Sequence, residues 1–327
     1  MNFYWHAAAL TALIVGSLVP IASVWAQPDA YPSRPVRILV PFPPGGSVDT
    51  VARLVAPKLG EGLGQPVVID NRSGASGNIG TEQVARAKPD GYTLLLNTVP
   101  LTSNPHLFKQ LPFDVLVDFA PIMLISSSPS LVVVHPSVPA RTVLELVELA
   151  RSKPGGLNYS SAGVGTNPHI SGELFNFLAK VNIIAIQFKG GGPALAATLG
   201  GEIGITFNNI ADTLPHVKSG RLRVLGTTGA RRSQALPDVP TIAEAGLTGY
   251  EFTAWHGLLG PRDVPAAHLA AINAKLQQAL RTPELAKRFD EMGLDIVAST
   301  QEAFGAHLKS EHEKWGRLVK ERNIRSE

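Results

Sequence analysis

One pattern recurs along this chain and limits its fold: a short apolar stretch, a glycine-rich turn, then apolar residues at helical spacing. In the first unit, residues 36–42 (VRILVPF) lead into Pro43–Gly46, and apolar residues follow at helical intervals as far as Leu59. Three further units of this kind follow. Strands that alternate with helices are typical of an α/β fold with a largely parallel sheet. We therefore predict an α/β fold.

In a parallel sheet, the glycine-rich turns of these units would lie together at the carboxyl ends of the strands, where open α/β proteins bind ligands. Glycine lets the backbone approach a ligand closely, and free N–H groups at helix starts attract anions. One such turn alone is more simply a tight βα connection, but four together favour a binding site. The turns are Pro43–Asp49, Gly74–Gly80, Ser160–Asn167 and Gly190–Pro193.

Polar side chains near these turns are candidates for holding a ligand. The hydroxyl and amide candidates are Ser47, Ser76, Asn78, Ser161, Thr166 and Asn208. Ser47 can also cap the helix that follows it. Asp49 stands in the first turn of that helix, where a carboxylate interacts favourably with the helix dipole. We expect Asp49 to order its turn, with a role as general base and contact to a ligand amine as the alternatives.

Enzyme motifs are weak in this chain. The glycines from Gly74 onward lack the spacing of a dinucleotide-binding turn, and no phosphate loop is present. The same turn falls one residue short of a nucleophile elbow. His169 could act as a base toward Ser161, but we favour a hydrogen bond from this histidine to a ligand or to the backbone. We therefore predict no catalytic residues.

Composition excludes further classes of protein. With no cysteine, the chain can form neither a disulfide scaffold nor a Cys-ligated zinc site. His307 and His312 are five residues apart, the wrong spacing for one metal-binding helix face, and we expect both to be solvent-exposed. The formal charge is only +3, and no basic stripe is visible, so nucleic-acid binding is not expected. We predict no metal and no cofactor.

The first 26 residues differ from the rest. Residues 7–24 are almost wholly apolar or small, and Val24 and Ala26 occupy the positions that precede signal-peptide cleavage. We predict a signal peptide over residues 1–26 and a periplasmic location. A membrane anchor is the alternative.

The remainder is longer than one core usually supports, so two lobes are expected. We assign residues 27–125 and 232–327 to the first lobe and residues 126–231 to the second. The segment Ser126–Ser130 (SSSPS) is expected to form a flexible crossing between them.

Several segments together resemble the Bug-type (TctC-like) solute receptors of tripartite tricarboxylate transporters. They occur in order between residue 32 and about residue 320: Pro41–Asp49, Gly64–Asn78, Lys88–Thr93, Tyr159–Thr166 with His169, Phe188–Ala194 and Leu236–Gly246. The resemblance implies a type II periplasmic binding-protein fold, in which two Rossmann-like lobes close on a ligand in the cleft between them.

The resemblance also implies a function. The chain would capture a small organic carboxylate (a di- or tricarboxylate, an amino acid or an aromatic acid) and deliver it to the permease subunits of a membrane transporter, without catalysis. We expect it to act as a monomer. The substrate-binding residues that we predict are Phe42, Gly46, Ser47, Asp49, Ser76, Asn78, Ser161, Gly165, Thr166, His169 and Asn208.

Two departures from the family pattern bear on which acid is bound. Asn208 and Asn209 replace an expected acidic residue, and Ser73 replaces a proline. Two other functions stay open: a periplasmic hydrolase or isomerase, and a ligand sensor for a signalling partner.

Overall fold

The computed structural model describes residues 31–322 and 324, of which Pro32 onward belongs to one compact unit. The signal peptide predicted over residues 1–26 lies outside the described residues. Among the described helices, none is both long and apolar enough to cross a membrane.

The first sheet is built around three parallel strands, β1 (Val36–Val40), β2 (Val67–Asn71) and β3 (Thr93–Asn97), in the order β2-β1-β3. Every apolar side chain of β1 is fully buried, as expected for a parallel strand that is covered on both faces. The sheet continues with β9 (Thr253–Pro261), which is antiparallel to β3 and to β4 (Phe119–Val134).

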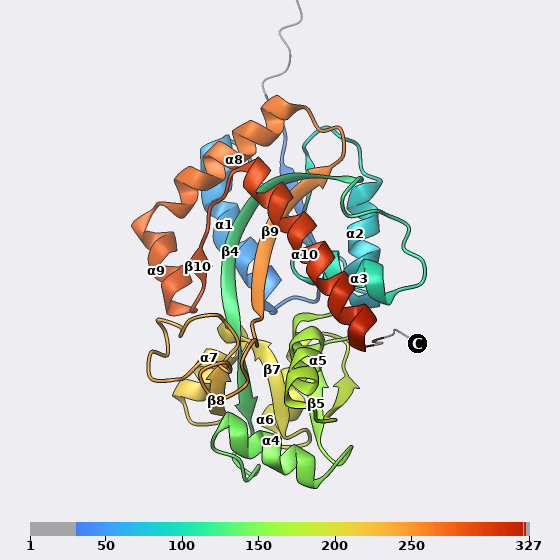
Figure 1. Ribbon diagram of the computed structural model, residues 1–327. Coiled ribbons are helices and arrows are strands. Elements are labelled where there is room, and N and C mark those ends of the chain that lie inside the picture. Colours follow the sequence, from blue (N-terminus) through green and yellow to red (C-terminus); the bar gives the residue numbers. More distant parts are fainter. Residues whose placement is uncertain (1–30, 323, 325–327) are drawn as a thin grey trace, which may run out of the picture. The chain divides into compact units, whose positions relative to one another are not determined.

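The second sheet has the same plan. Its parallel strands β5 (Asn158–Ser161), β6 (Ile184–Gln187) and β7 (Ile205–Asn209) run in the order β7-β5-β6. The last residues of β4 pair with β7 and with β8 (Arg223–Thr227), both antiparallel. The strand β4 therefore belongs to both sheets (Figure 1).

The crossing between the sheets is a strand and not the flexible segment that we expected. The residues Ser126–Ser130 lie in the middle of the 16-residue strand β4. They pair with β9 on one side, and a two-residue strand, β10 (Asp295–Ile296), pairs with Ser126 and Ser127. The small side chains suggested mobility, but pairing partners far away in the sequence satisfy the backbone of this segment.

The division into lobes at residues 126 and 231 stays a prediction. Beyond residue 231 the chain still lies against the second sheet, because Ile242 donates a backbone hydrogen bond to Thr227 and Phe252 donates one to Thr228. It enters the first sheet at β9.

Helices cover the faces of the two sheets (Figure 1). They are α1 (Ser47–Leu63), α2 (Asn78–Ala85) after the short 3₁₀ turn η1 (Ala75–Gly77), α3 (Pro100–Leu107), α4 (Val143–Ser152), α5 (Asn167–Ala179), α6 (Gly191–Leu199), α7 (Ile210–Lys218), α8 (Ala266–Leu280), α9 (Pro283–Glu291) and α10 (Gln301–Arg322). The last helix packs back on the first sheet, against α3 and β4. Its Trp315 is buried, lies 5.7 Å from the ring of Phe252 and donates a hydrogen bond to Glu311.

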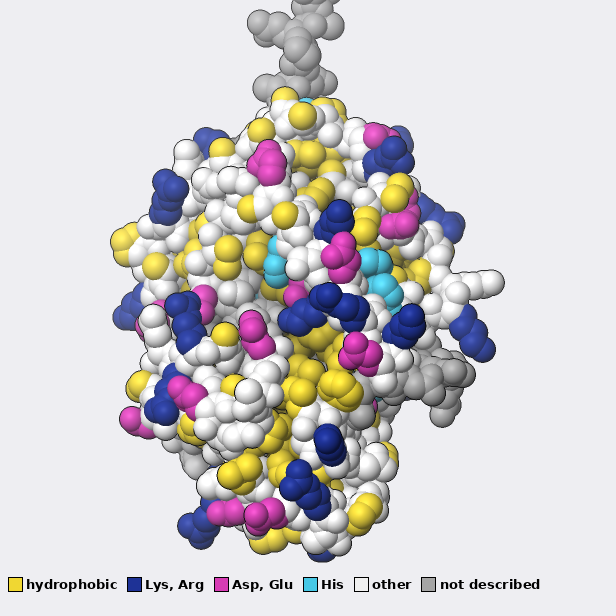
Figure 2. Space-filling view, viewed as in Figure 1, with side chains coloured by type: hydrophobic (Ala, Val, Ile, Leu, Met, Phe, Trp, Pro, Cys, Tyr) yellow, Lys and Arg dark blue, Asp and Glu magenta, His cyan; other side chains and the backbone are white. Residues whose placement is uncertain are grey.

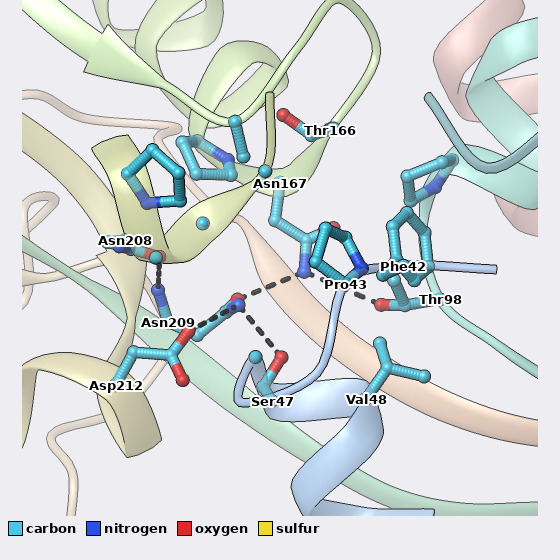
Figure 3. Close-up of a pocket in the computed structure, with 18 of the residues that line it drawn as sticks. Phe42, Pro43, Ser47, Val48, Thr98, Thr166, Asn167, Asn208, Asn209 and Asp212 are labelled. Carbon is cyan, nitrogen blue, oxygen red and sulfur yellow. Dashed lines mark hydrogen bonds between the residues drawn. The ribbon is translucent and has the colours of Figure 1, made fainter. Parts of the chain in front are cut away.

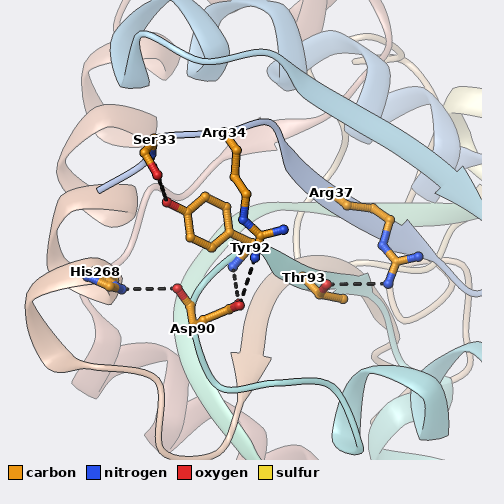
Figure 4. A network of polar contacts seen from close by, with 7 residues as sticks. All are labelled: Ser33, Arg34, Arg37, Asp90, Tyr92, Thr93 and His268. Carbon is orange, nitrogen blue, oxygen red and sulfur yellow. Dashed lines mark hydrogen bonds and ion pairs between the residues drawn. The ribbon is translucent and has the colours of Figure 1, made fainter. Parts of the chain in front are cut away.

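Residues that precede β1 are held by a polar network (Figure 4). The backbone of Ser33 donates to the hydroxyl of Tyr92 at 2.8 Å, and Arg34 lies 4.1 Å above the ring of Tyr92 and 3.0 Å from Asp90. A ring nitrogen of His268 in α8 lies 3.2 Å from the carbonyl oxygen of Asp90. The network anchors the amino end of β1, whose carboxyl end leads into the candidate site.

Candidate functional site

Two adjoining cavities lie at the carboxyl ends of strands from both sheets, and we call them together the cleft. The first cavity has a volume of about 90 Å³, and the second of about 390 Å³. Both are lined by Phe42, Pro43, Ala162, Thr166 and Gly190. The cleft therefore lies where ligands bind in open α/β folds.

All four predicted turns meet at this cleft. The turn after β1 and the turns at 162–166 and 190–193 contribute to the first cavity, and the turn Gly74–Gly77 contributes to the second. The approach is close: a β-carbon at Gly190 would lie 2.9 Å from Cγ of Pro43, and one at Gly163 would lie 3.1 Å from Oγ of Ser76. The sequence analysis correctly expected that these turns would come together.

Three helices start at the cleft without a side-chain cap. The residues at their N-caps, Gly46 for α1, Thr166 for α5 and Gly190 for α6, make no capping hydrogen bond through a side chain. The first N–H groups of each helix also have no acceptor within the helix. Our expectation that Ser47 caps α1 is wrong, because Ser47 is already the first helical residue.

Amide side chains join the two sheets at the base of the first cavity (Figure 3). Asn209 at the end of β7 donates from Nδ2 to Oγ of Ser47 at 2.9 Å. Its Oδ1 accepts a hydrogen bond of 3.0 Å from Nδ2 of Asn167, which also lies 3.4 Å from Oγ1 of Thr98. Our list of site residues missed Asn167, Asn209 and Thr98. Asn209 ends a strand, Thr98 directly follows a strand, and Asn167 ends one of the four turns. These positions in the sequence could have identified them as candidates.

Two buried amide atoms in the first cavity have no partner among the described residues. They are Nδ2 of Asn208 and Oδ1 of Asn167, on side chains that are 1% and 3% exposed. Oδ1 of Asn208 already accepts from the backbone N–H of Asn209, so its Nδ2 is the free donor. Buried polar groups normally have a partner. The cavity therefore offers one donor and one acceptor to a ligand.

Asp212 is the only ionisable side chain among the described residues that line the first cavity. Burial raises the pKa of its carboxyl to about 6, although a hydrogen bond from Asn209 opposes this shift. In the second cavity, Lys189 is the one ionisable residue among the described lining residues. Our list of site residues did not include Asp212 either.

The predicted site residues divide into two groups. Phe42, Gly46, Ser47, Ser76, Thr166 and Asn208 line the cleft. Asp49, Asn78, Ser161, Gly165 and His169 lie behind its walls and line neither cavity. In this structure the second group supports the turns and does not contact the cavities.

Asp49 orders the turn after β1. Its carboxylate accepts hydrogen bonds of 2.9 Å from the backbone of Gly45, from Nε of Arg53 and from Nδ2 of Asn71. Burial alone would raise the pKa of Asp49, but these donors outweigh it and lower the pKa below its usual value. The carboxylate is thus fully used by the turn, as we had favoured.

Ser161 and His169 do not form a nucleophile–base pair. The hydroxyl of Ser161 donates to the carbonyl oxygen of Gly163, while Nδ1 of His169 accepts from the backbone N–H of Gly165 at 3.2 Å. Burial lowers the pKa of His169 to about 4, so the ring is neutral at physiological pH. The nucleophile–base pair that we considered for Ser161 and His169 is therefore not formed in this structure.

Helix α3, which the sequence analysis missed, supports two of the turns from behind. Asn104 donates from Nδ2 to Oδ1 of Asn78 at 2.8 Å and to the carbonyl oxygen of Ser76 at 3.1 Å. The hydroxyl of Ser103 donates to the carbonyl oxygen of Gly165 at 3.0 Å. A short polar helix with Pro105 inside it has no clear apolar stripe to announce it.

The expectation that His307 and His312 are solvent-exposed is wrong. Both are partly buried: the ring of His307 lies 5.5 Å from that of Trp255, and the ring of His312 lies 4.2 Å from that of His106. Aromatic neighbours on β9 and α3 cover them. Within residues 31–322 and 324, no group of three His, Cys, Asp or Glu side chains is arranged to hold a metal ion.

On the face shown in Figure 2, basic and acidic side chains are intermingled, and apolar side chains gather on its lower half. No basic stripe is visible on this face.

Comparisons with known proteins give a consistent result. The model of the tripartite tricarboxylate transporter family receptor matches residues 51–324. The structure of the periplasmic binding protein BugD is similar, with a TM-score of 0.86 and 32% identity over 90% of this chain and 100% of that chain.

Two similar structures contain ligands. An R. palustris protein solved with adipate has a TM-score of 0.87 and 34% identity, over 90% of this chain and 98% of that chain. MatC from Rhodopseudomonas palustris, with bound malate, has a TM-score of 0.85 and 32% identity, over 88% of this chain and 100% of that chain.

Proposed function

The chain belongs to the tripartite tricarboxylate transporter receptor family, and from this premise we propose that it captures a small organic carboxylate in the cleft and delivers it to a membrane permease. The predicted family and fold class are confirmed: the chain is a Bug-type, TctC-like receptor with a periplasmic binding-protein fold. Solute binding is the function of proteins of this kind, and their structures with adipate and malate make a carboxylate the reasonable ligand here.

One observation carries the proposal: four turns meet at a cleft in which unpaired donors outnumber cations. The free N–H groups at the starts of α1, α5 and α6 and Nδ2 of Asn208 supply donors, and Lys189 lies at the second cavity. A hydrogen bond to a charged group contributes about 1.5–3 kcal/mol. A few such bonds reach the roughly 8 kcal/mol of micromolar affinity, which suits capture followed by release.

Closure of two lobes over the ligand is part of the proposal. Among the hydrogen bonds between residues that we assign to different lobes, three lie at the cleft or directly behind it: Asn209 to Ser47, Ser103 to Gly165, and Asn167 to Thr98. The chain passes from the first sheet to the second within the paired strand β4, and it enters the first sheet again at the paired strand β9. Bending of such strands would open the cleft while each sheet stays intact.

Three further features belong to the same proposal. We place the chain in the periplasm, as BugD is a periplasmic binding protein and residues 1–26 have the pattern of a signal peptide. We propose that it works as a monomer. We also propose that it has no catalytic activity, because Ser161 and His169 each bond to the backbone and not to one another.

The test is a search for ligand in two steps. Mass spectrometry of natively purified protein should detect a trapped organic acid, and a thermal-shift screen of mono-, di- and tricarboxylates should then identify acids that bind. A ligand at 100 times its dissociation constant adds about 2.7 kcal/mol to the free energy of unfolding. Absence of any stabilising acid, or conversion of a bound acid into product, would contradict the proposal.

A further inference from the structure

Asp212 gives the first cavity a feature that a site for simple carboxylates does not need. We propose that Asp212 makes the cleft select acids that also carry a cationic nitrogen, such as amino acids, over simple carboxylates of the same skeleton. This inference rests on the proposed function and adds a specificity-determining residue to it.

The carboxylate of Asp212 has almost no partner within the protein. Oδ2 of Asp212 lies 3.4 Å from Nδ2 of Asn209, but that amide makes its shorter bond, of 2.9 Å, to Ser47. None of the ion pairs between described residues includes Asp212, and no Lys, Arg or His is among the described residues that line its cavity. An ionised carboxylate can accept about four hydrogen bonds, so most of its capacity is open to a ligand.

Asp49 shows what a structural carboxylate looks like in this protein. Along the chain, Asp49 lies as near to residues of the cleft as Asp212 does. Its carboxylate nevertheless accepts hydrogen bonds from three donors, one of them on Arg53. Asp212 has no comparable shell. A half-buried carboxylate with a single weak donor destabilises the ligand-free protein, and such groups are often found at functional sites.

A capping role does not account for Asp212. It is the third residue of α7, where an acidic side chain could reach back to the N-cap residue, Asn209. The backbone N–H of Asn209 donates instead to Oδ1 of Asn208 at 2.8 Å. The capping bond is therefore not made, and the carboxylate lies at the cavity wall (Figure 3).

The amide side chains around Asp212 also leave an acceptor oxygen that needs a hydrogen-bond donor. Because the carboxylate can only accept, Asn209 turns Nδ2 toward it and Oδ1 toward Nδ2 of Asn167. This leaves Oδ1 of Asn167 as a buried acceptor without a partner. An ammonium group has three donors and a positive charge, and would satisfy both acceptors. The ligand carboxylate would take the opposite partners, Nδ2 of Asn208 and the helix starts.

The test uses matched pairs of acids that differ only by an amino group: succinate and L-aspartate, glutarate and L-glutamate, and 3-phenylpropionate and L-phenylalanine. Binding of each acid to the full mature protein is measured by isothermal titration at pH 7.5. We expect the wild type to bind the amino member of at least one pair ten times or more tightly than its partner. Asp212→Asn, which keeps the size of the side chain, should lose tenfold or more for that amino acid and keep or improve binding of the simple acid.

Controls separate this inference from the proposed function. Asp263→Asn makes the same change at an exposed position and should leave every affinity unchanged. Asp212→Ser, a second variant, should repeat the loss of preference. If simple acids bind and Asp212→Asn changes both members of each pair equally, selection by Asp212 is wrong and the receptor proposal stands. If none of the amino acids binds the wild type, selection by Asp212 is wrong, and the receptor proposal is overturned only if the wider screen of carboxylates also finds no ligand.

Discussion

Asn209 donates a hydrogen bond of 2.9 Å from Nδ2 to Oγ of Ser47, and this bond joins the end of β7 in the second sheet to the start of α1 at the first. Both side chains are buried at the base of the first cavity. If the cleft closes as we propose, this residue pair forms when the ligand site forms. Its effect can be measured on binding.

Ser47→Ala should weaken ligand binding about threefold to tenfold, because a neutral hydrogen bond contributes about 0.5–1.5 kcal/mol. The loss belongs to the pair, so Ser47→Ala should have much less effect in a protein that already carries Asn209→Ala. Titration of the four proteins of this double-mutant cycle measures the coupling. Additive effects would show that the two side chains contact the ligand independently and do not hold the lobes together.

Gly190→Ala should block closure. Gly190 has φ +110°, and its added β-carbon would lie 2.9 Å from Cγ of Pro43, a residue of the other side of the cleft. We expect ligand affinity to fall at least tenfold. Gly220→Ala is the control, since Gly220 also has a positive φ, of +73°, but has no atom within 4 Å of the added carbon. Equal loss of binding in the two variants would show that backbone strain, and not the contact with Pro43, lowers the ligand affinity.

Asp49→Ala should lower the free energy of unfolding by about 2–3 kcal/mol, since hydrogen bonds to a charged, buried group are lost. Because Asp49 lines neither cavity, the affinities for an amino acid and for its simple-acid partner should fall by the same factor. The lowered pKa of Asp49 means that its contribution is full above the unfolded-state value and is lost as pH falls through the folded value. Urea unfolding and titration of one matched pair check both parts. A selective loss for the amino acid would show that Asp49 contacts the ligand.

The sequence was sufficient for the fold class and for the meeting of the four turns, because strand, turn and helix patterns are local and parallel strands bring their carboxyl ends together. The whole of β9 was missed, since its identity as a strand comes from pairing with β3 and β4, which lie far away in the chain.

The site was predicted only in part for a related reason. Proximity in sequence to a glycine turn does not show whether a side chain points into the cleft or behind it. Ser76 and Thr166 line the second cavity, while Asn78 and His169 support the walls. The importance of Asp212 depends on what surrounds it. A single carboxylate in a helix start is ordinary in sequence, and only the structure shows that no cation is among the described residues that line its cavity.

Asp212→Asn should stabilise the ligand-free protein. Burial raises the pKa of Asp212 from 3.8 to about 6, so the folded state holds the proton more tightly than the unfolded state does. The free energy of unfolding of the wild type therefore falls as pH rises from about 4 to 6, by about 2–3 kcal/mol in total, and then stays level. The variant has no carboxylate to ionise. The amount by which its free energy of unfolding exceeds that of the wild type should therefore grow from near zero at pH 4 to its full value at pH 7. Urea unfolding at pH 4, 5.5 and 7 measures the difference. A constant difference at all three values would mean that the carboxylate is not strained by burial.

Acid should destabilise the protein through two buried histidines. Burial lowers the pKa of His169 and of His256 from 6.5 to about 4. Between these values the unfolded state binds protons that the folded state does not, so the free energy of unfolding falls as pH decreases from 6.5 to 4, by about 3 kcal/mol for each ring. His169→Asn keeps an acceptor near the N–H of Gly165 but cannot titrate, and it should make the pH dependence less steep by about one proton. Unfolding free energies measured at pH 7.5, 5.5 and 4.5 give the slope. If the wild type and the variant lose stability in parallel, the pKa of His169 is the same in the folded and unfolded states, and burial does not lower it.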